Sequence, residues 1–356
     1  MRFLKHFLLF ILPISSGWAC TDLVIQTQDG AYINGRSLEF ALPLKSKITL
    51  NPRGMKNQSK APNNEKGLSW TSKYGYLSID VLDEGLTTDG INEAGLSVGV
   101  LWFPGVEYPQ PPSGLGSNAI VLQDVADWLL GNFSTTAEAR TSLAKINIWA
   151  ESIQSLGIPP VHLAVHDAQG NHLVIEFVEN RVIVTNNPNG VMTNFPKLEW
   201  HLTNLRNYIN LSPLNAAPLT INGVMLAPTG QGTGLHGIPG DWSSPSRFVR
   251  ASFFKSFAAP VATAALGINL MEHLLNTFDI PIGAVRADDN PADFEQTQWI
   301  VIKDLKNKVL YYRTYEDLTL RYIDLKKLDF STGPNTQSIL MESTPQPVDM
   351  TKSLLN

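Results

Sequence analysis

The chain has 356 residues, of which 43% are hydrophobic, and a formal net charge of −5 at pH 7. This mildly acidic composition contains no basic run and excludes electrostatic binding to nucleic acid or to anionic lipid. The single cysteine also excludes internal disulfide bonds. The length is sufficient for one large domain with a substantial core.

Residues 1–19 predict a secretory signal peptide. A positively charged start is followed by an apolar run at 7–12 and by small residues at the two positions that a signal peptidase reads, Gly17 and Ala19. The apolar run is too short to span a bilayer, so we expect no integral membrane span in the mature chain. Cleavage between Ala19 and Cys20 would release an exported protein, either periplasmic or secreted.

Cleavage at this point would make Cys20 the N-terminal residue of the mature chain. A thiol and a free α-amine would then lie on one residue, as a nucleophile and a potential base. Two other interpretations remain open, namely an incidental cysteine or a lipidated cysteine in an exported lipoprotein or binding protein. A lipoprotein signal usually has Leu three residues before its cysteine and small residues between, whereas this chain has Gly17 and Trp18 there.

The next segment predicts a β-hairpin whose first strand begins at Cys20 and whose turn contains Asp29-Gly30, a pair suited to positive φ. If these two residues form the whole loop, Glu39 lies directly across from Cys20 and Arg36 points to the other face. If Gln28 joins the loop, the pairing shifts by one residue and Arg36 becomes the diagonal neighbour of Cys20. Each register brings a charged side chain to the thiol.

The chemistry of a cysteine nucleophile gives each charged neighbour a use. An unperturbed thiol has a pKa of ~8.5 and an α-amine has one of ~7.7–8.0, so the amine is the better base at neutral pH. Arg36 would favour the thiolate, and Glu39 would hold and orient the amine. An ordinary cross-strand ion pair is the alternative interpretation. To have both side chains beside Cys20 would require a bulge or bend near Gly35.

The rest of the chain reads as a layered α+β domain. We expect a mobile loop at 51–66, because it is polar and punctuated by Pro and Gly, and a weakly structured tail at 331–356. A capping-box pattern at Thr135 and Glu138 marks the start of one helix. Strands are predicted at 21–38, 74–81, 96–103, 161–187 and 296–313, and helices at 118–130, 136–146, 246–257 and 262–278.

Two motifs and a histidine pair are interpreted as having no catalytic or ligand-binding role. The run 95–99 fits the G-x-S-x-G of serine esterases, but a turn precedes Ser97 and a strand follows it, which reverses the required order. The G-x-G-x-x-G at 232–237 is followed by I-P-G where a phosphate-binding helix should begin. His162 and His166 lie about 13 Å apart along a predicted strand, too far to share one ion. We therefore expect no cofactor and no metal.

Five motifs, taken in chain order, carry a resemblance to a known family. They are C-T at 20–21 with G-R-S-L-E at 35–39, D-G-I-N-E-A-G-L at 89–96, L-W-F-P at 101–104, M-T-N-F-P at 192–196, and the run from G-Q-G-T-G to S-R-F at 230–248. Together they resemble the choloylglycine hydrolase and penicillin V acylase family of N-terminal-nucleophile hydrolases. The resemblance spans nearly the whole mature chain, 20–356, as a single hydrolase domain. It implies a four-layer αββα sandwich and a homotetramer.

The resemblance also implies roles for individual residues. Cys20 would be the nucleophile, and Arg36 and Arg247 would lie near its thiolate. Asn194 and the backbone N–H of Trp102 would form an oxyanion hole, in which the loss of one donor typically costs roughly 2.7–4 kcal/mol of barrier. The alternative for Asn194 is a turn residue before a Phe-Pro pair.

Two positions depart from the pattern of bile salt hydrolases. Glu39 stands where an aspartate is expected to hold the α-amine, and it is one methylene longer. Trp102 stands where bile salt hydrolases often have asparagine and penicillin V acylases an aromatic residue. With Phe40, it predicts an apolar wall for an aromatic or alkyl acyl group. The expected reaction is hydrolysis of a small-molecule N-acyl amide, with penicillin V, conjugated bile salts and acyl-homoserine lactones as alternative substrates.

Overall fold

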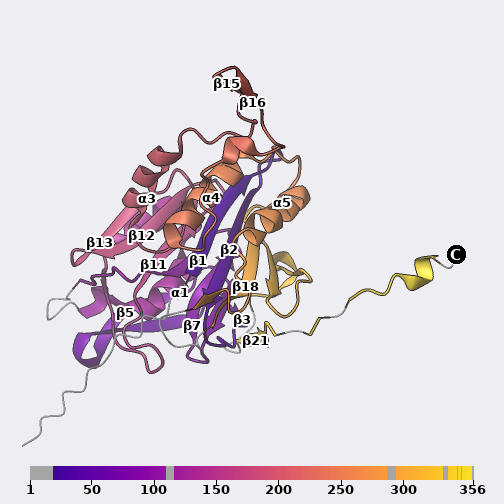
Figure 1. Cartoon of the computed structure of the whole chain (residues 1–356). Coiled ribbons are helices and arrows are strands. Elements are labelled where there is room, and N and C mark those ends of the chain that lie inside the picture. The colour runs from indigo at the N-terminus through magenta and orange to yellow at the C-terminus, as the bar shows by residue number, and fades with distance from the viewer. Residues whose placement is uncertain are drawn as a thin grey trace, which may run out of the picture.

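The computed structural model describes residues 19–109, 116–286, 294–331, 336–342, 344–345 and 347–354. The predicted signal peptide, apart from Ala19, lies outside the described residues. Within them, two antiparallel sheets face each other, and helices cover the outer face of each sheet (Figure 1). The α+β sandwich predicted from the family resemblance is therefore confirmed, with four layers in the order α, β, β, α.

The first sheet carries the predicted N-terminal hairpin at its centre. Its strands, in spatial order, are β14 (Val191–Met192), β1 (Ala19–Gln26), β2 (Tyr32–Phe40), β18 (Phe294–Asp304), β19 (Val309–Thr314) and β20 (Arg321–Asp324), and β17 (Val285–Arg286) pairs with one end of β18. Strands from both ends of the chain thus lie beside β1 and β2.

The second sheet is built mainly from the middle of the chain, and a strand from near the C-terminus forms one of its edges. Its spatial order is β13 (Arg181–Asn186), β12 (His172–Val178), β11 (Val161–His166), β8 (Ser97–Trp102), β7 (Leu86–Asn92), β6 (Tyr76–Val81), β3 (Lys47–Asn51) and β21 (Gln337–Leu340). The pairing of β21 with β3, and the burial of Met341 beyond it, attach residues 336–342 to the domain. This part of the predicted tail is therefore an edge strand.

Five α-helices are found in the described residues. They are α1 (Leu122–Asn132), α2 (Thr136–Leu143), α3 (Leu198–Asn204), α4 (Ser244–Phe257) and α5 (Ala264–Asn276). The capping prediction for α2 is confirmed, because the Thr135 hydroxyl accepts a hydrogen bond from the N–H of Glu138 at 3.2 Å. No helix of the described chain has the length and hydropathy needed to cross a membrane.

Two apolar cores hold the layers together. One lies between the two sheets and under α4 and α5, which cover the first sheet. The other lies between the second sheet and α1 with α2. Gly35 in β2 permits this packing, since a Cβ there would lie only 2.4 Å from the sulfur of Met271 in α5.

Three smaller two-stranded elements complete the described chain. They are β4 (Lys56–Ala61) with β5 (Glu65–Thr71), β9 (Ala119–Val121) with the parallel β10 (Asn147–Trp149), and β15 (Leu219–Ile221) with β16 (Val224–Leu226). The prediction of a loop at 51–66 is wrong, because β4 is a polar strand stabilised by docking and not by an apolar repeat. Its buried Ser59 accepts a hydrogen bond from the N–H of Val121 at 3.0 Å, and Trp149 donates to the Lys60 carbonyl at 2.9 Å.

The register of β1 and β2 decides between the two alternatives left open by the sequence. Cys20 pairs with Leu38, and Asp22 pairs with Arg36, so Gln28 belongs to the loop. Gly30 has a φ of 78°, as expected for the last residue of such a three-residue turn. Arg36 is therefore the diagonal neighbour of Cys20 on the face toward the second sheet, and Glu39 lies across from Ala19.

Candidate active site

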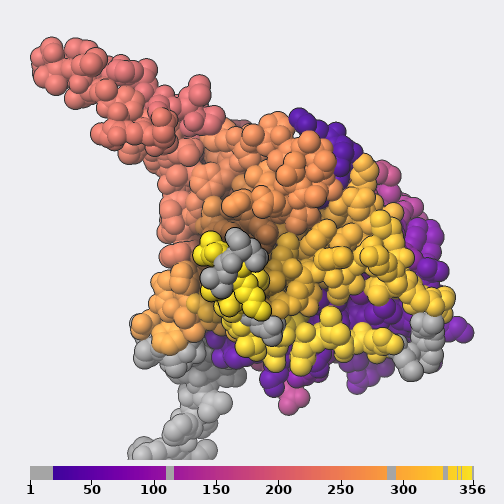
Figure 2. All heavy atoms as spheres, turned by 90° about the vertical axis from the view of Figure 1, so that its right-hand side faces the viewer, coloured from indigo at the N-terminus to yellow at the C-terminus, as the bar shows by residue number. Residues whose placement is uncertain are grey.

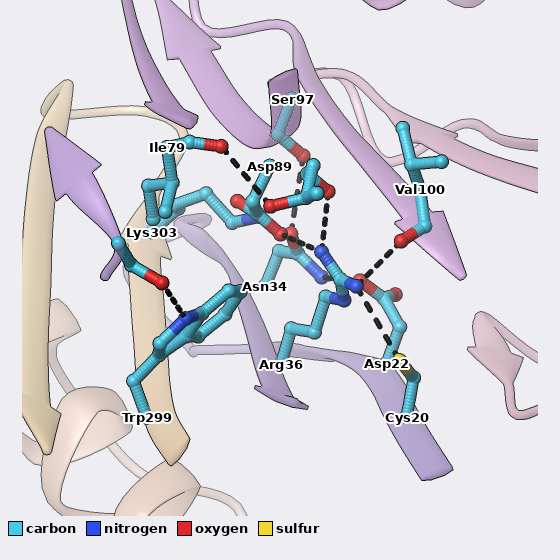
Figure 3. A network of polar contacts seen from close by, with 12 residues as sticks. Cys20, Asp22, Asn34, Arg36, Ile79, Asp89, Ser97, Val100, Trp299 and Lys303 are labelled. Carbon is cyan, nitrogen blue, oxygen red and sulfur yellow. Dashed lines mark hydrogen bonds and ion pairs between the residues drawn. The ribbon is translucent and has the colours of Figure 1, made fainter. Parts of the chain in front are cut away.

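Arg36 fills a split in the second sheet. The pairing of β7 with β8 ends at Asp89 and Gly99, and the next pair in register would be Thr88 with Val100. The guanidinium of Arg36 lies at this position, where Nη1 donates to the Thr88 carbonyl and Nη2 to the Val100 carbonyl, each at 2.5 Å (Figure 3). A side chain from the first sheet thus takes the place of one backbone pair between β7 and β8 in the second sheet. These hydrogen bonds fix the guanidinium in one orientation.

The thiol of Cys20 lies at the near edge of this guanidinium. Its Sγ accepts a hydrogen bond from Nη2 of Arg36 at 3.5 Å, and the cysteine is 0% exposed (Figure 3). The predicted neighbourhood of the thiol and Arg36 is therefore present. Although burial opposes the charge of Arg36, the sulfur and Asp89 raise its pKa.

Arg247 and Asn194 surround the backbone of Cys20 from the side of α4. Asn194 accepts the N–H of Cys20 on Oδ1 at 2.9 Å, and Arg247 donates to the same oxygen at 2.6 Å. Arg247 also donates to the Cys20 carbonyl and, at 2.8 Å, to the hydroxyl of Thr21. The arginine approaches the nucleophile through its backbone and not through its sulfur.

Asn194 and Trp102 lie together, as the predicted oxyanion hole requires. Nδ2 of Asn194, the expected donor to the oxyanion, donates to the Trp102 carbonyl at 2.8 Å in the uncleaved chain. Oδ1 faces the N–H of Cys20, so the amide is oriented by contacts at both of its ends. A substrate oxygen would have to take Nδ2 from that carbonyl.

Glu39 lies on the opposite face of β2 from Arg36. It is 0% exposed and pairs with Ala19, while Thr297 donates to its Oε1 at 3.4 Å. Burial raises the pKa of Glu39 to about 8, and the charge of Arg247 partly opposes this shift. The register irregularity that accompanies this arrangement is in β18, between Thr297 and Trp299, and not near Gly35 as the sequence suggested.

Three buried residues of the site, Asp89, Lys303 and Asp22, were given no role by the sequence reasoning. Asp89 bridges Arg36 and Lys303, with Oδ2 3.1 Å from Nη1 and Oδ1 2.5 Å from Nζ (Figure 3). Asp22, which shares the face of Cys20, lies 2.7 Å from Nε2 of His166. Period-two alternation could have found Asp22, and a lysine inside the apolar run W-I-V-I-K could have pointed to Lys303.

Phe40 and Trp102 do not form the single apolar wall that the sequence predicted. Phe40 packs in the core between the sheets, whereas Trp102 packs in the core under α1. The alternation of side chains along β2 and β8 sends them to different layers. Trp102 instead lines a largely apolar cavity of about 60 Å³ that also includes Thr88, Val100, Leu156 and Val161.

Ser97 and the two histidines, to which the sequence analysis assigned no catalytic or metal-binding role, contact other protein groups. Ser97 begins β8 after a turn, as expected, and donates to Asn34 at 3.1 Å. His162 contacts the Thr193 carbonyl through Nε2 at 2.9 Å, whereas Nε2 of His166 lies 2.7 Å from Asp22. Within the described part of the chain, no group of three or more His, Cys, Asp or Glu side chains could hold a metal ion.

The sandwich, with a cysteine at the start of a central strand and arginine and asparagine side chains around it, defines the class of N-terminal-nucleophile hydrolase folds. The chain belongs to the choloylglycine hydrolase family of linear amide C–N hydrolases, whose pattern it matches over residues 20–341. It is therefore a linear amide C–N hydrolase.

Individual relatives agree with this assignment. The chain is 32% identical over 314 residues to a bile salt hydrolase/transferase of Clostridium perfringens, covering 86% of this chain and 93% of that protein. It is 26% identical over 353 residues to a penicillin V acylase of Pectobacterium atrosepticum, with 90% and 87% covered.

Solved structures give the same fold. A mutant conjugated bile acid hydrolase from Clostridium perfringens superposes with a TM-score of 0.82 at 27% identity, covering 93% of this chain and 99% of the other. Penicillin V acylase from Agrobacterium tumefaciens gives a TM-score of 0.73 at 24% identity, with 90% of each chain covered. The second likeness concerns the fold alone.

Proposed function

We propose that this protein is an exported amidohydrolase that cleaves the C–N bond of small N-acyl amides with Cys20 as its nucleophile. The observation that carries the proposal is the buried Sγ of Cys20 at 3.5 Å from the fixed guanidinium of Arg36. A cation at this distance favours the thiolate, which is the reactive form of cysteine. The cysteine also directly follows the predicted cleavage site at Ala19.

Cleavage after Ala19 would create the base as well as expose the nucleophile. In the uncleaved chain the nitrogen of Cys20 is an amide that donates to Asn194, and it has no basic lone pair. The freed α-amine would take the thiol proton, and the thiolate would attack the substrate carbonyl. The leaving amine would then take this proton, and water would hydrolyse the thioester to release the acid and regenerate the thiol. The uncleaved chain is accordingly inactive.

Glu39 has the position needed to receive the new ammonium group. It pairs with Ala19, whose removal would leave a gap beside the nitrogen of Cys20. A positive charge there would lower the pKa of a carboxyl that burial now raises to about 8. The extra methylene of glutamate lengthens its reach toward the amine.

The substrate has a hydrophobic acyl group in this proposal. The cavity beside Trp102 lies between α1 and the second sheet, next to Thr88 and Val100, whose carbonyls bind Arg36. An acyl chain would enter it from the side of Cys20 by the split in the sheet that Arg36 now fills. At about 60 Å³ the cavity is far smaller than the roughly 300–1,000 Å³ of typical ligand sites, so the site must open to admit a substrate. Penicillin V, conjugated bile salts and long-chain acyl-homoserine lactones are the classes to screen, with the purified mature enzyme.

N-terminal sequencing, intact mass and two substitutions test the mechanism. We expect a mature chain that begins at free Cys20, and a diacylglyceryl adduct on that residue would contradict it in favour of a lipoprotein. Cys20→Ala should lower amide hydrolysis by about 10⁴-fold or more, because the covalent step is lost. Ser97→Ala is the matched control and should keep nearly normal activity. A serine esterase would reverse these two results.

We further propose that the protein assembles as a homotetramer through an arm formed by residues 212–235. The arm projects from the body (Figure 2), and six of its large apolar side chains are at least half exposed. These side chains are Leu214, Leu219, Ile221, Val224, Met225 and Leu226. An isolated two-stranded hairpin is at best marginally stable in water, so this exposed surface favours a second copy of the chain as its partner.

Light scattering after size-exclusion chromatography tests the assembly. Val224→Glu with Leu226→Glu should convert the tetramer to smaller species, since the arm would then expose charge where a neighbour packs. Leu318→Glu, at another exposed apolar position, is the control and should leave the mass unchanged. A monomeric unsubstituted protein would contradict the proposal.

Localisation is tested by fractionation, where we expect the mature chain in the periplasm or medium.

A further inference from the structure

Lys303 is a buried cation near the end of β18, directly after the apolar run 299–302. It pairs with Asn34 of β2 and is a diagonal neighbour of Arg36, and its side chain is 0% exposed. Lysine is almost never fully buried unless it is paired. Its partner is Asp89, whose Oδ1 lies 2.5 Å from Nζ and which is also 0% exposed.

Asp89 uses its two oxygens for two different cations. Oδ1 binds Lys303, and Oδ2 binds Nη1 of Arg36 at 3.1 Å (Figure 3). Nη2 of the same guanidinium then reaches Sγ of Cys20 at 3.5 Å. Lys303 of β18, Asp89 of β7 and Arg36 of β2 thus form a series of charges of alternating sign. The series ends at the thiol of Cys20 at the start of β1.

The alternation changes how much positive charge the thiol experiences. If Asp89 paired with Arg36 alone, the carboxylate would offset much of the guanidinium charge, and interactions between charges are strong away from water. Lys303 compensates Asp89 from the far side and leaves the charge of Arg36 to act on Cys20.

The other charged groups near the line are already matched in part. Asp22 is bound to His166 and to the amide of Asn34 on the face toward the second sheet, and the charge of Lys303 also acts on it. Arg247 lies on the face toward α4, where the charges of Glu39, of the Cys20 thiol and of Glu295 act on it. The indole of Trp299 covers Arg36, with its centroid 5.3 Å from the guanidinium carbon.

We propose that Lys303 is a positioning residue for amide hydrolysis, which acts through Asp89 and Arg36 to keep a net positive charge facing Cys20. It does not touch the substrate. This inference rests on the proposed function of Cys20 as the nucleophile, and it assigns a catalytic consequence to a lysine on the far side of the site.

Alkylation of Cys20 by iodoacetamide across the pH range tests the inference. The chain has one cysteine, so the rate of alkylation reports this thiol alone. Lys303→Met should raise the midpoint of the pH profile by about one unit, because the uncompensated Asp89 disfavours the thiolate. Lys303→Gln keeps a hydrogen-bond donor without the charge and should give a similar shift, which also protects the test if the methionine variant fails to fold. Lys303→Arg should preserve the midpoint.

A second substitution separates charge from structure. Asp89→Asn combined with Lys303→Met removes one charge of each sign and should return the midpoint toward that of the unsubstituted enzyme. Lys306→Met, at an exposed lysine just after the same strand, is the control and should leave the midpoint unchanged. For folded Lys303→Met and Lys303→Gln enzymes, kcat/KM below the midpoint should fall about tenfold, in step with the thiolate fraction.

Unshifted midpoints in folded Lys303→Met or Lys303→Gln enzyme would overturn the inference, even if the melting temperature fell. A double variant with a further raised midpoint would overturn it as well. The activity of Cys20→Ala separates this outcome from failure of the proposed function. Retained hydrolysis in that variant refutes the nucleophile, whereas lost hydrolysis with an unshifted midpoint in the Lys303 variants refutes only the role of Lys303.

Discussion

The two faces of the central hairpin differ in how completely their charges are matched. Toward the second sheet, Arg36 has a carboxylate, two carbonyls and the thiol as partners, and Asp89 is bound on both oxygens. Toward α4, Glu39 is buried with Oε2 accepting no hydrogen bond from the described residues. Burial raises the pKa of Glu39 to about 8 and lowers that of Arg247.

This difference separates what folding supplies from what the proposed cleavage would supply. On the face that would act on the sulfur, both terminal nitrogens of Arg36 and both oxygens of Asp89 have partners while Ala19 is still attached, although Nε of Arg36 has none among the described residues. The face that would act on the nitrogen holds the carboxyl group of Glu39, whose pKa burial raises and the charge of Arg247 only partly lowers. We therefore expect substitutions on the first face to affect both the uncleaved and the mature chain, and those around Glu39 to change in effect on cleavage.

Among the substitutions that test the difference between the two faces, we expect the largest loss of activity and stability at Arg36. Arg36→Met should lower kcat/KM by about 10²–10³-fold, because losing a nearby cation raises a thiol pKa by roughly 1–3 units. It should also destabilise the uncleaved and mature chains by about 3–5 kcal/mol, since Asp89 loses a buried partner. Hydrolysis rates and urea denaturation of both forms measure these effects.

Arg36→Lys is the control for charge without geometry. A single ammonium cannot bridge the Thr88 and Val100 carbonyls as the guanidinium fork does, so we expect partial activity and incomplete recovery of stability. Full activity in Arg36→Met, or equal stability of Arg36→Met and the parent, would show that the first face is not preassembled around this residue.

A smaller effect is expected at Asn194, which contacts both the nitrogen of Cys20 and the Trp102 carbonyl. Asn194→Ala should lower kcat by about 10²–10³-fold if Nδ2 serves the oxyanion. KM should change much less, because the donor acts on charge that develops in the transition state. A variant that raised KM while kcat stayed constant would assign Asn194 to substrate binding instead.

Much of the site could be predicted because it depends on local periodicity. The period-two alternation of β1 and β2 requires Arg36 to face Cys20 once the loop is fixed at three residues, and the structure has this register. The family resemblance then implied that Arg247 lies near the thiolate and that Asn194 serves the oxyanion, and the structure places both side chains against the backbone of Cys20, while their roles stay predictions.

The features that could not be predicted depend on pairing between distant segments. Lys303 reaches Asp89 only because β18 lies beside β2 and the sheets face each other, and no local signal gives that arrangement. Phe40 and Trp102 were placed together because both are apolar, but the layer to which each points depends on the register of two different sheets. The polar strand β4 has no periodic signal, since its stability comes from docking on β9.

The smallest expected effect is the pH dependence of folding stability that Glu39 contributes. It is also the sharpest test of the face toward α4. In the uncleaved chain its pKa of about 8 exceeds the value of ~4.3 in an unfolded chain, so the folded state binds the proton more tightly. This contribution to stability is complete below pH ~4 and is lost as the pH rises to about 8. Glu39→Gln should therefore gain a few degrees in melting temperature relative to the parent between pH 5 and pH 8.

The measurement uses full-length chain with Cys20→Ala in both proteins, purified without export and verified by intact mass. In mature chain, an ammonium beside Glu39 would hold its pKa low, and stability would then be lost as the pH falls. In the mature chain, Glu39→Gln should accordingly be less stable than the parent at pH 7. In the uncleaved chain, the same variant should be more stable than the parent at pH 8. An effect of the same sign in both forms would mean that Glu39 does not respond to the new N-terminus. Because the reversal depends on the nitrogen and not on the sulfur, it tests the second face without disturbing the first.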